Sequence, residues 1–156
     1  MSDAEPMNVA AAIEKLNAAL ALQYRSAVEH TVVAGTLTGV SWQPLEPVLW
    51  TAAQDDLADA RRIVQKIVAI GGTPTTDVAS FELRSSPEDG LRQLIEHECE
   101  TLAAFHAVIP DTGQEPRSEA MEHRLEHLIM RKQEHVDTLR RTLGITDEAS
   151  GSAASS

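Results

Sequence analysis

The chain has 156 residues, of which 13 are basic and 24 acidic, and a formal net charge of −11. A chain of this length folds as one domain with a substantial core. The negative charge disfavours nucleic acid and anionic membranes as partners, and an aromatic content of 3% offers no stacking platform for bases.

Three features of the sequence favour a cytoplasmic protein without a membrane segment. The first residues lack the basic stretch and apolar run of a secretory signal. The single cysteine, Cys99, cannot form an internal disulfide, which is usual in a reducing compartment. No window approaches the roughly 18 apolar residues that a membrane span needs.

Apolar residues recur at steps of three and four in four segments, which is the period of an amphipathic helix. We expect helices over residues 8–35, 47–70, 87–109 and 118–143. Glycine or proline follows each segment closely, as is typical of helix ends. Ser86-Pro87-Glu88-Asp89 has the composition of a helix start, with a hydroxyl cap, a proline and then acids.

The lengths of the connections predict how these helices pack. The first and third are short and suit antiparallel neighbours, whereas the second has about 14 residues and could extend about 45 Å. Two antiparallel hairpins joined by a long crossover form the ferritin-like four-helix bundle, an all-α fold. We expect a flexible N-terminus over 1–7, the bundle over 8–144 and a disordered tail over 145–156.

The apolar stripe of each predicted helix is interrupted near its middle by polar residues. They are Gln23 and His30 in the first helix, Asp56 and Asp59 in the second, Glu98 in the third, and Lys132 and His135 in the fourth. Burying ionisable groups is costly unless they pair with one another or bind a metal. A layer to which all four helices contribute is therefore either a metal site or the remains of one.

Taken singly, each of these residues has a plainer interpretation. Alternative stripes through Leu57 or Tyr24 would turn Asp56 and Gln23 toward solvent. The histidines without a partner at diagnostic spacing are interpreted as mostly surface residues: His30, His97, His106, His123 and His127. The coincidence of interruptions at comparable depth in four helices favours the shared layer.

Several stretches resemble bacterioferritin and its ferritin-like relatives. They are Ile13-Glu14-Lys15-Leu16-Asn17, the Trp42 loop, residues 62–74, Leu91-Arg92 ahead of Glu98, and residues 135–139. The similarity covers residues 8–144 and carries no single specific motif. It leaves open whether the chain forms a homo-oligomer.

The di-iron centre of that family uses a glutamate from each of two helices and a Glu-x-x-His pair from each of the other two. The resemblance places the two single glutamates at Gln23 and Glu98. It places the two pairs at Asp56 with Asp59 and at Lys132 with His135. The methionine that binds haem in bacterioferritin falls on Leu57, so we expect no haem of that type.

The charges of this set argue against a complete di-iron ferroxidase centre. Three carboxylates (Asp56, Asp59 and Glu98) face one ammonium and one histidine, and Lys132 can occupy the space of one metal ion. We therefore predict one divalent ion (iron, manganese or zinc) bound by Asp56 or Asp59, Glu98 and His135, with at most weak oxidase activity. Gln23, His30 and Lys132 would line this site.

Three alternatives stay open. The first is a metal-free ferritin-like scaffold in which Lys132 replaces the charge of the ion. The second is a plain helical interaction module whose polar residues face solvent. The third is a small DNA-protecting ferritin, whose turn is similar to Gly71-Gly72-Thr73-Pro74 and whose first-helix histidine could be His30. This last reading ranks below the others because matching second-helix acids and a basic tail are missing.

Overall fold

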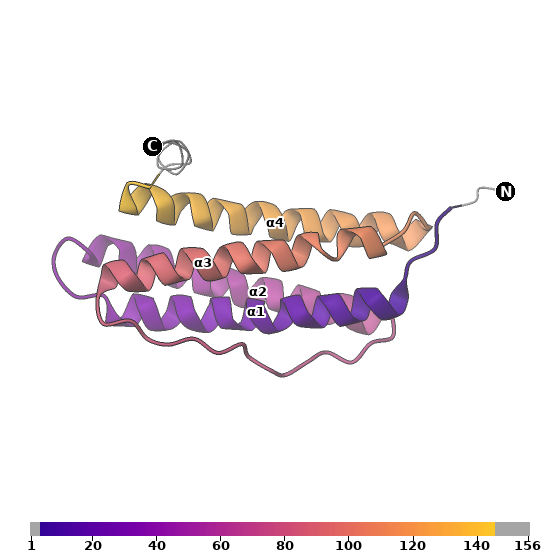
Figure 1. Cartoon of the computed structure of the whole chain (residues 1–156), viewed down its shortest axis with the longest axis horizontal. Coiled ribbons are helices and arrows are strands. Elements are labelled where there is room, and N and C mark those ends of the chain that lie inside the picture. Colours follow the sequence, from indigo (N-terminus) through magenta and orange to yellow (C-terminus); the bar gives the residue numbers. More distant parts are fainter. Residues whose placement is uncertain (1–3, 146–156) are drawn as a thin grey trace, which may run out of the picture.

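The computed structural model describes residues 4–145, and they form a bundle of four long helices (Figure 1). The helices are α1 (Val9–Thr36), α2 (Glu46–Ala69), α3 (Pro87–His106) and α4 (Pro116–Leu143). Short 3₁₀ turns, η1 (Gln43–Leu45) and η2 (Ile109–Asp111), lie in the two hairpin connections. The described residues include no strand, and the predicted all-α bundle is confirmed.

No helix within residues 4–145 is long and apolar enough to cross a membrane. The predicted tail, 145–156, lies outside the described residues except for Ile145. Residues 5–7, at the other end, contact the α3–α4 connection. Gln114 N donates to Glu5 O at 2.6 Å, and the side chain of Met7 is buried.

The crossover between the hairpins, residues 70–86, runs along the length of the bundle beside α1 (Figure 1). Asn17 binds it at two points: Nδ2 donates to Thr73 O at 3.0 Å, and Oδ1 accepts from Thr75 N at 2.8 Å. Ala79 N donates to Ala21 O at 3.1 Å. These bonds satisfy backbone groups of a segment that has no secondary structure of its own.

The local sequence explains where the helices begin and end. Ser86 caps α3 by accepting a hydrogen bond from Asp89 N at 3.2 Å, as its sequence predicts. The prediction that this helix continues to 109 is wrong, because α3 ends at His106. Pro110 has no amide hydrogen to donate to the carbonyl of His106, and the chain turns instead into η2.

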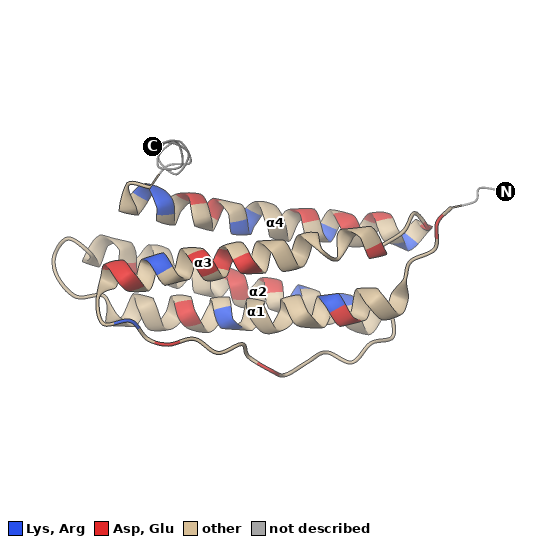
Figure 2. Cartoon of the chain, in the orientation of Figure 1, with Lys and Arg blue, Asp and Glu red and all other residues tan. Residues whose placement is uncertain are grey.

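The apolar core consists of two clusters, one toward each end of the bundle. Leu20, Ile63 and Phe105 are central to the first cluster, and Leu49 and Leu91 belong to the second. The polar residues of all four helices lie between them, and acidic residues of α2 and α3 mark this level (Figure 2). Apolar packing on both sides shields the polar layer from water, which strengthens electrostatic interactions within it.

The turn that ends α2 constrains Gly72. A Cβ atom at this position would lie 2.8 Å from Ile67 Cγ2 and 2.9 Å from Ile13 Cγ2, which is closer than packing allows. We predict that Gly72→Ala lowers the free energy of unfolding by about 1–3 kcal/mol through overpacking. The control, Gly35→Ala in α1, meets no atom within 4 Å and should leave stability unchanged or raise it by up to about 1 kcal/mol. Urea denaturation measures both, and equal effects would contradict the packing argument.

Candidate metal centre

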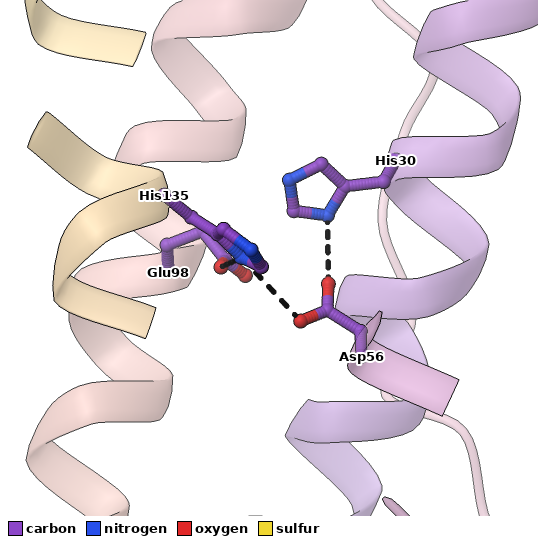
Figure 3. Close-up of side chains that lie close together, drawn as sticks. All are labelled: His30, Asp56, Glu98 and His135. Atoms are coloured by element: carbon purple, nitrogen blue, oxygen red, sulfur yellow. Dashed lines mark ion pairs between the residues drawn. The ribbon is translucent and has the colours of Figure 1, made fainter. Parts of the chain in front are cut away.

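Four side chains, one from each helix, converge between the two apolar clusters (Figure 3). They are His30, Asp56, Glu98 and His135, and each offers one ligand atom within 4.8 Å of the others. The first three are at most 1% exposed, and the side chain of His135 is 15% exposed. Ligands 2.0–2.2 Å from one ion lie at most about 4.4 Å apart, so a contraction of a few tenths of an ångström would complete the set.

The side chain of Lys132 joins two of these residues. Its Nζ atom lies 2.9 Å from Asp56 Oδ1 and 3.1 Å from Glu98 Oε2, with the lysine side chain 3% exposed. Ser26 Oγ donates to the other carboxylate oxygen of Glu98, Oε1, at 2.5 Å. The ammonium therefore links carboxylates that come from α2 and α3.

His30 is held by its Nδ1 atom, which lies 2.8 Å from Ser26 O and 2.9 Å from Asp56 Oδ2. A histidine that donates from Nδ1 to an oxygen presents Nε2 as its metal ligand in the neutral form. His30 Nε2 is buried and has no hydrogen-bond partner. The imidazole is thus oriented in the manner of a metal-binding histidine.

Each of the four converging residues has one buried polar atom without a hydrogen bond. The atoms are His30 Nε2, Asp56 Oδ2, Glu98 Oε2 and His135 Nδ1. The two carboxylate oxygens are within ion-pair distance of a cation, and His135 Nδ1 lies 3.6 Å from Asp56 Oδ1. Buried atoms without directed hydrogen bonds are rare in native proteins, and a bound ion is one way to satisfy them.

Ion pairs within the layer, taken together, shift the pKa values of Glu98, Lys132 and His30 more than burial does. Burial alone would raise the pKa of the Glu98 carboxyl, but the charge of Lys132 holds this pKa well below its usual range. Burial would lower the pKa of Lys132 and of His30, yet Glu98 and Asp56 raise both above their ordinary values. Two carboxylates therefore face two groups that favour their cationic forms, and the layer is close to neutral without an ion.

Asp59, a predicted ligand, lies outside this group. Its Oδ1 atom accepts a bond from Arg62 at 2.7 Å, and its Oδ2 atom lies 3.2 Å from Nε of Arg131. Burial raises the pKa of Asp59, and the two arginines oppose that effect. Gln23 lines the layer, donating from Nε2 to the backbone oxygen of Asp56 at 2.9 Å.

The structure corrects the interpretation of the histidines. His30 is fully buried and is not a surface residue. His97, whose side chain is 19% exposed, contacts the buried carboxylate of Glu29 at 2.8 Å. His123 and His127 do have a partner, since their Nε2 atoms lie 3.2 Å apart. Their spacing of four residues signalled this pair, whereas nothing in the sequence linked Glu29 to His97.

One edge of this otherwise buried layer opens to solvent at His135, whose side chain is 15% exposed. A groove of about 680 Å³ lies between α2 and α4, and its lining includes His30, His135, Asp55 and Met130. An ion could therefore approach the two histidines without the helices separating.

Comparison with known proteins supports this architecture. Residues 13–149 match the family of the ferritin-like domain. The chain belongs to the ferritin-like family. A crystal structure of ferritin-like di-iron-carboxylate proteins from Bacillus anthracis str. Ames is similar to this ferritin-like protein with a TM-score of 0.78 and 26% identity. The similarity covers 92% of this chain and 99% of the other. A search of curated proteins finds no match.

The residues present do not fit a pair of iron ions. A di-iron carboxylate centre uses four carboxylates and two histidines, whereas this layer offers two carboxylates and two histidines. The ammonium of Lys132 contacts both carboxylates. The donor set does fit one divalent ion, because imidazole with carboxylate suits iron, manganese and zinc.

Substitution of Lys132 tests how much the ion pairs of the layer contribute to stability. We predict that Lys132→Met lowers the free energy of unfolding of the metal-free protein by about 3–5 kcal/mol, since two buried carboxylates lose their shared cation. Arg92→Met, which removes the exposed partner of Glu88, should change it by less than about 1 kcal/mol. Urea denaturation in a chelating buffer measures both. An effect of Lys132→Met as small as that of Arg92→Met would show that the layer does not depend on this pair.

Proposed function

We propose that this ferritin-like protein binds one divalent metal ion per chain, with iron as the leading candidate. The ligands would be His30, Asp56, Glu98 and His135. The observation that supports this proposal is the convergence of four ligand groups, one from each helix, each of which also has a buried polar atom without a hydrogen bond. Residues of four different helices converge on one point only if packing holds them there.

Charge explains why the site would hold one ion and not two. Asp56 and Glu98 contribute two negative charges and Lys132 one positive charge, so one divalent ion brings the layer to a net charge of +1. A second ion would raise it to +3 in a region shielded from water, which is strongly unfavourable. Lys132 therefore acts as a fixed substitute for a second cation, and the centre is a reduced form of the family's di-iron site.

The surrounding residues prepare the ligands. Ser26 supports two of them, because its hydroxyl donates to Glu98 and its carbonyl accepts from His30. Gln23 fixes the backbone that carries Asp56. An iron ion bound here would supply one-electron redox chemistry, and with a single ion we expect at most weak oxidase activity.

A metal-free scaffold is the second candidate function. It is favoured by the same ion pairs, because Lys132 and a protonated His30 balance Asp56 and Glu98 without any ion. The two candidates differ in what happens when metal is offered. The scaffold predicts no specific uptake, whereas the metal protein predicts displacement of the His30 proton by the ion.

Counting bound iron separates these candidates. After incubation with ferrous iron without oxygen and gel filtration, we expect about one iron per chain in the unaltered protein. Glu98→Ala and His135→Ala should each abolish uptake, because each removes a ligand. Asp59→Asn is the control and should retain it, since Asp59 pairs with arginines outside the group.

The other outcomes are equally informative. Two irons per chain that depend on Glu98 would contradict the role assigned to Lys132. No iron in the unaltered protein would leave the scaffold as the function, and loss of iron in Asp59→Asn would place that residue among the ligands.

A further inference from the structure

A second pair of histidines lies on the exposed side of α4, apart from the buried layer. His123 and His127 are four residues apart, and their Nε2 atoms approach to 3.2 Å. The ring centroids are 4.6 Å apart and the rings are nearly perpendicular, at 89°. The two outer nitrogens thus lie close together at the surface, where His127 also lines the groove between α2 and α4.

This geometry matches the requirement for two ligands of one metal ion. Nitrogen ligands bind zinc at 2.0–2.1 Å, so two of them at angles between a right angle and the tetrahedral value lie about 2.8–3.4 Å apart. The observed 3.2 Å falls within that range. Residues at positions i and i+4 share a helix face, so α4 itself holds the pair in register.

We propose that His123 and His127 form a second metal site for a borderline divalent ion such as Zn²⁺, Cu²⁺ or Ni²⁺. Neutral imidazole is a preferred ligand of these ions, and water would fill the remaining positions. His127 lies eight residues before His135, which is about 12 Å along the helix axis, so this site is separate from the buried centre.

The charges near the pair favour a cation. Glu119, Glu122 and Glu126 belong to the same part of α4, and the whole chain carries a net charge of −11. Arg131, one turn beyond His127, has its Nε atom 3.2 Å from Asp59 Oδ2. This arginine is therefore engaged elsewhere and does not compete with an ion at the histidines.

The proposed role of His123 and His127 is metal binding without catalysis. His123, Glu126 and His127 follow the order His-x-x-Glu-His that also occurs in some zinc peptidases. A catalytic zinc has three protein ligands. Among residues 4–145, the one group of three or more convergent ligands is the buried one, so the exposed pair lacks the third ligand that catalysis needs.

Titration of the full-length protein with Ni²⁺ by calorimetry tests the proposal. We expect His123→Ala and His127→Ala each to lose one bound ion relative to the unaltered protein. His106→Ala removes an exposed histidine of α3 and should lose none. Glu98→Ala should retain the surface ion, so failure of the buried site and failure of this one can be told apart.

Copper supplies a second readout. In the spectrum of bound Cu²⁺ we expect electron paramagnetic resonance couplings from two imidazole nitrogens, and from one fewer in His123→Ala. Unchanged nickel binding and unchanged nitrogen couplings in His123→Ala would overturn the proposal. Because both histidines are exposed, these variants should fold, which circular dichroism verifies.

Discussion

The ammonium of Lys132, buried between the carboxylates of Asp56 and Glu98, is the interaction on which the centre of this bundle depends. It joins α2, α3 and α4 at one point, where apolar clusters on both sides keep water away. Removing charges from water is costly, and close geometry with additional hydrogen bonds is needed to compensate. Ser26 supplies one of those bonds to Glu98, and His30 adds a second cationic partner to Asp56.

This arrangement gives the layer two states, one close to neutral without an ion and one with a net charge of +1 when a divalent ion is bound. Without an ion, the two carboxylates are neutralised by Lys132 and His30. With an ion, His30 would give up its proton and turn a free nitrogen to the metal, while Lys132 remains. Apolar clusters on both sides of the layer give the bundle a core of its own, which small domains whose folding is driven by an ion lack. The bundle can therefore keep a fold of the ferritin-like family with part of the usual donor set.

The fold could be predicted from local patterns in the sequence. A bundle of two hairpins was predicted from the apolar period, the Ser86 cap and the long second connection. Each of these signals can be recognised from neighbouring residues, without knowledge of contacts between segments far apart in the sequence. The end of α3 was misplaced because the apolar period continues to Ile109, although Pro110 removes the hydrogen bond that the last turn would need.

The membership of the polar layer was harder to predict than its existence. Asp56 and Asp59 lie on the same side of α2, three residues apart, so periodicity alone does not show which of them belongs to the layer. The structure distinguishes the two residues, because ion pairs with Arg62 and Arg131 hold Asp59 away from the centre. His30 was assigned to the lining, and its orientation depends on the carbonyl of Ser26, which no spacing rule reveals.

The most direct test of a single-ion centre is an anomalous diffraction experiment on crystals of the full chain soaked with Mn²⁺. A single-ion centre predicts one peak per chain between His30, Asp56, Glu98 and His135, with Lys132 still beside the two carboxylates. Two peaks in the layer, a lysine displaced from the carboxylates, or a layer that takes up no ion would contradict it.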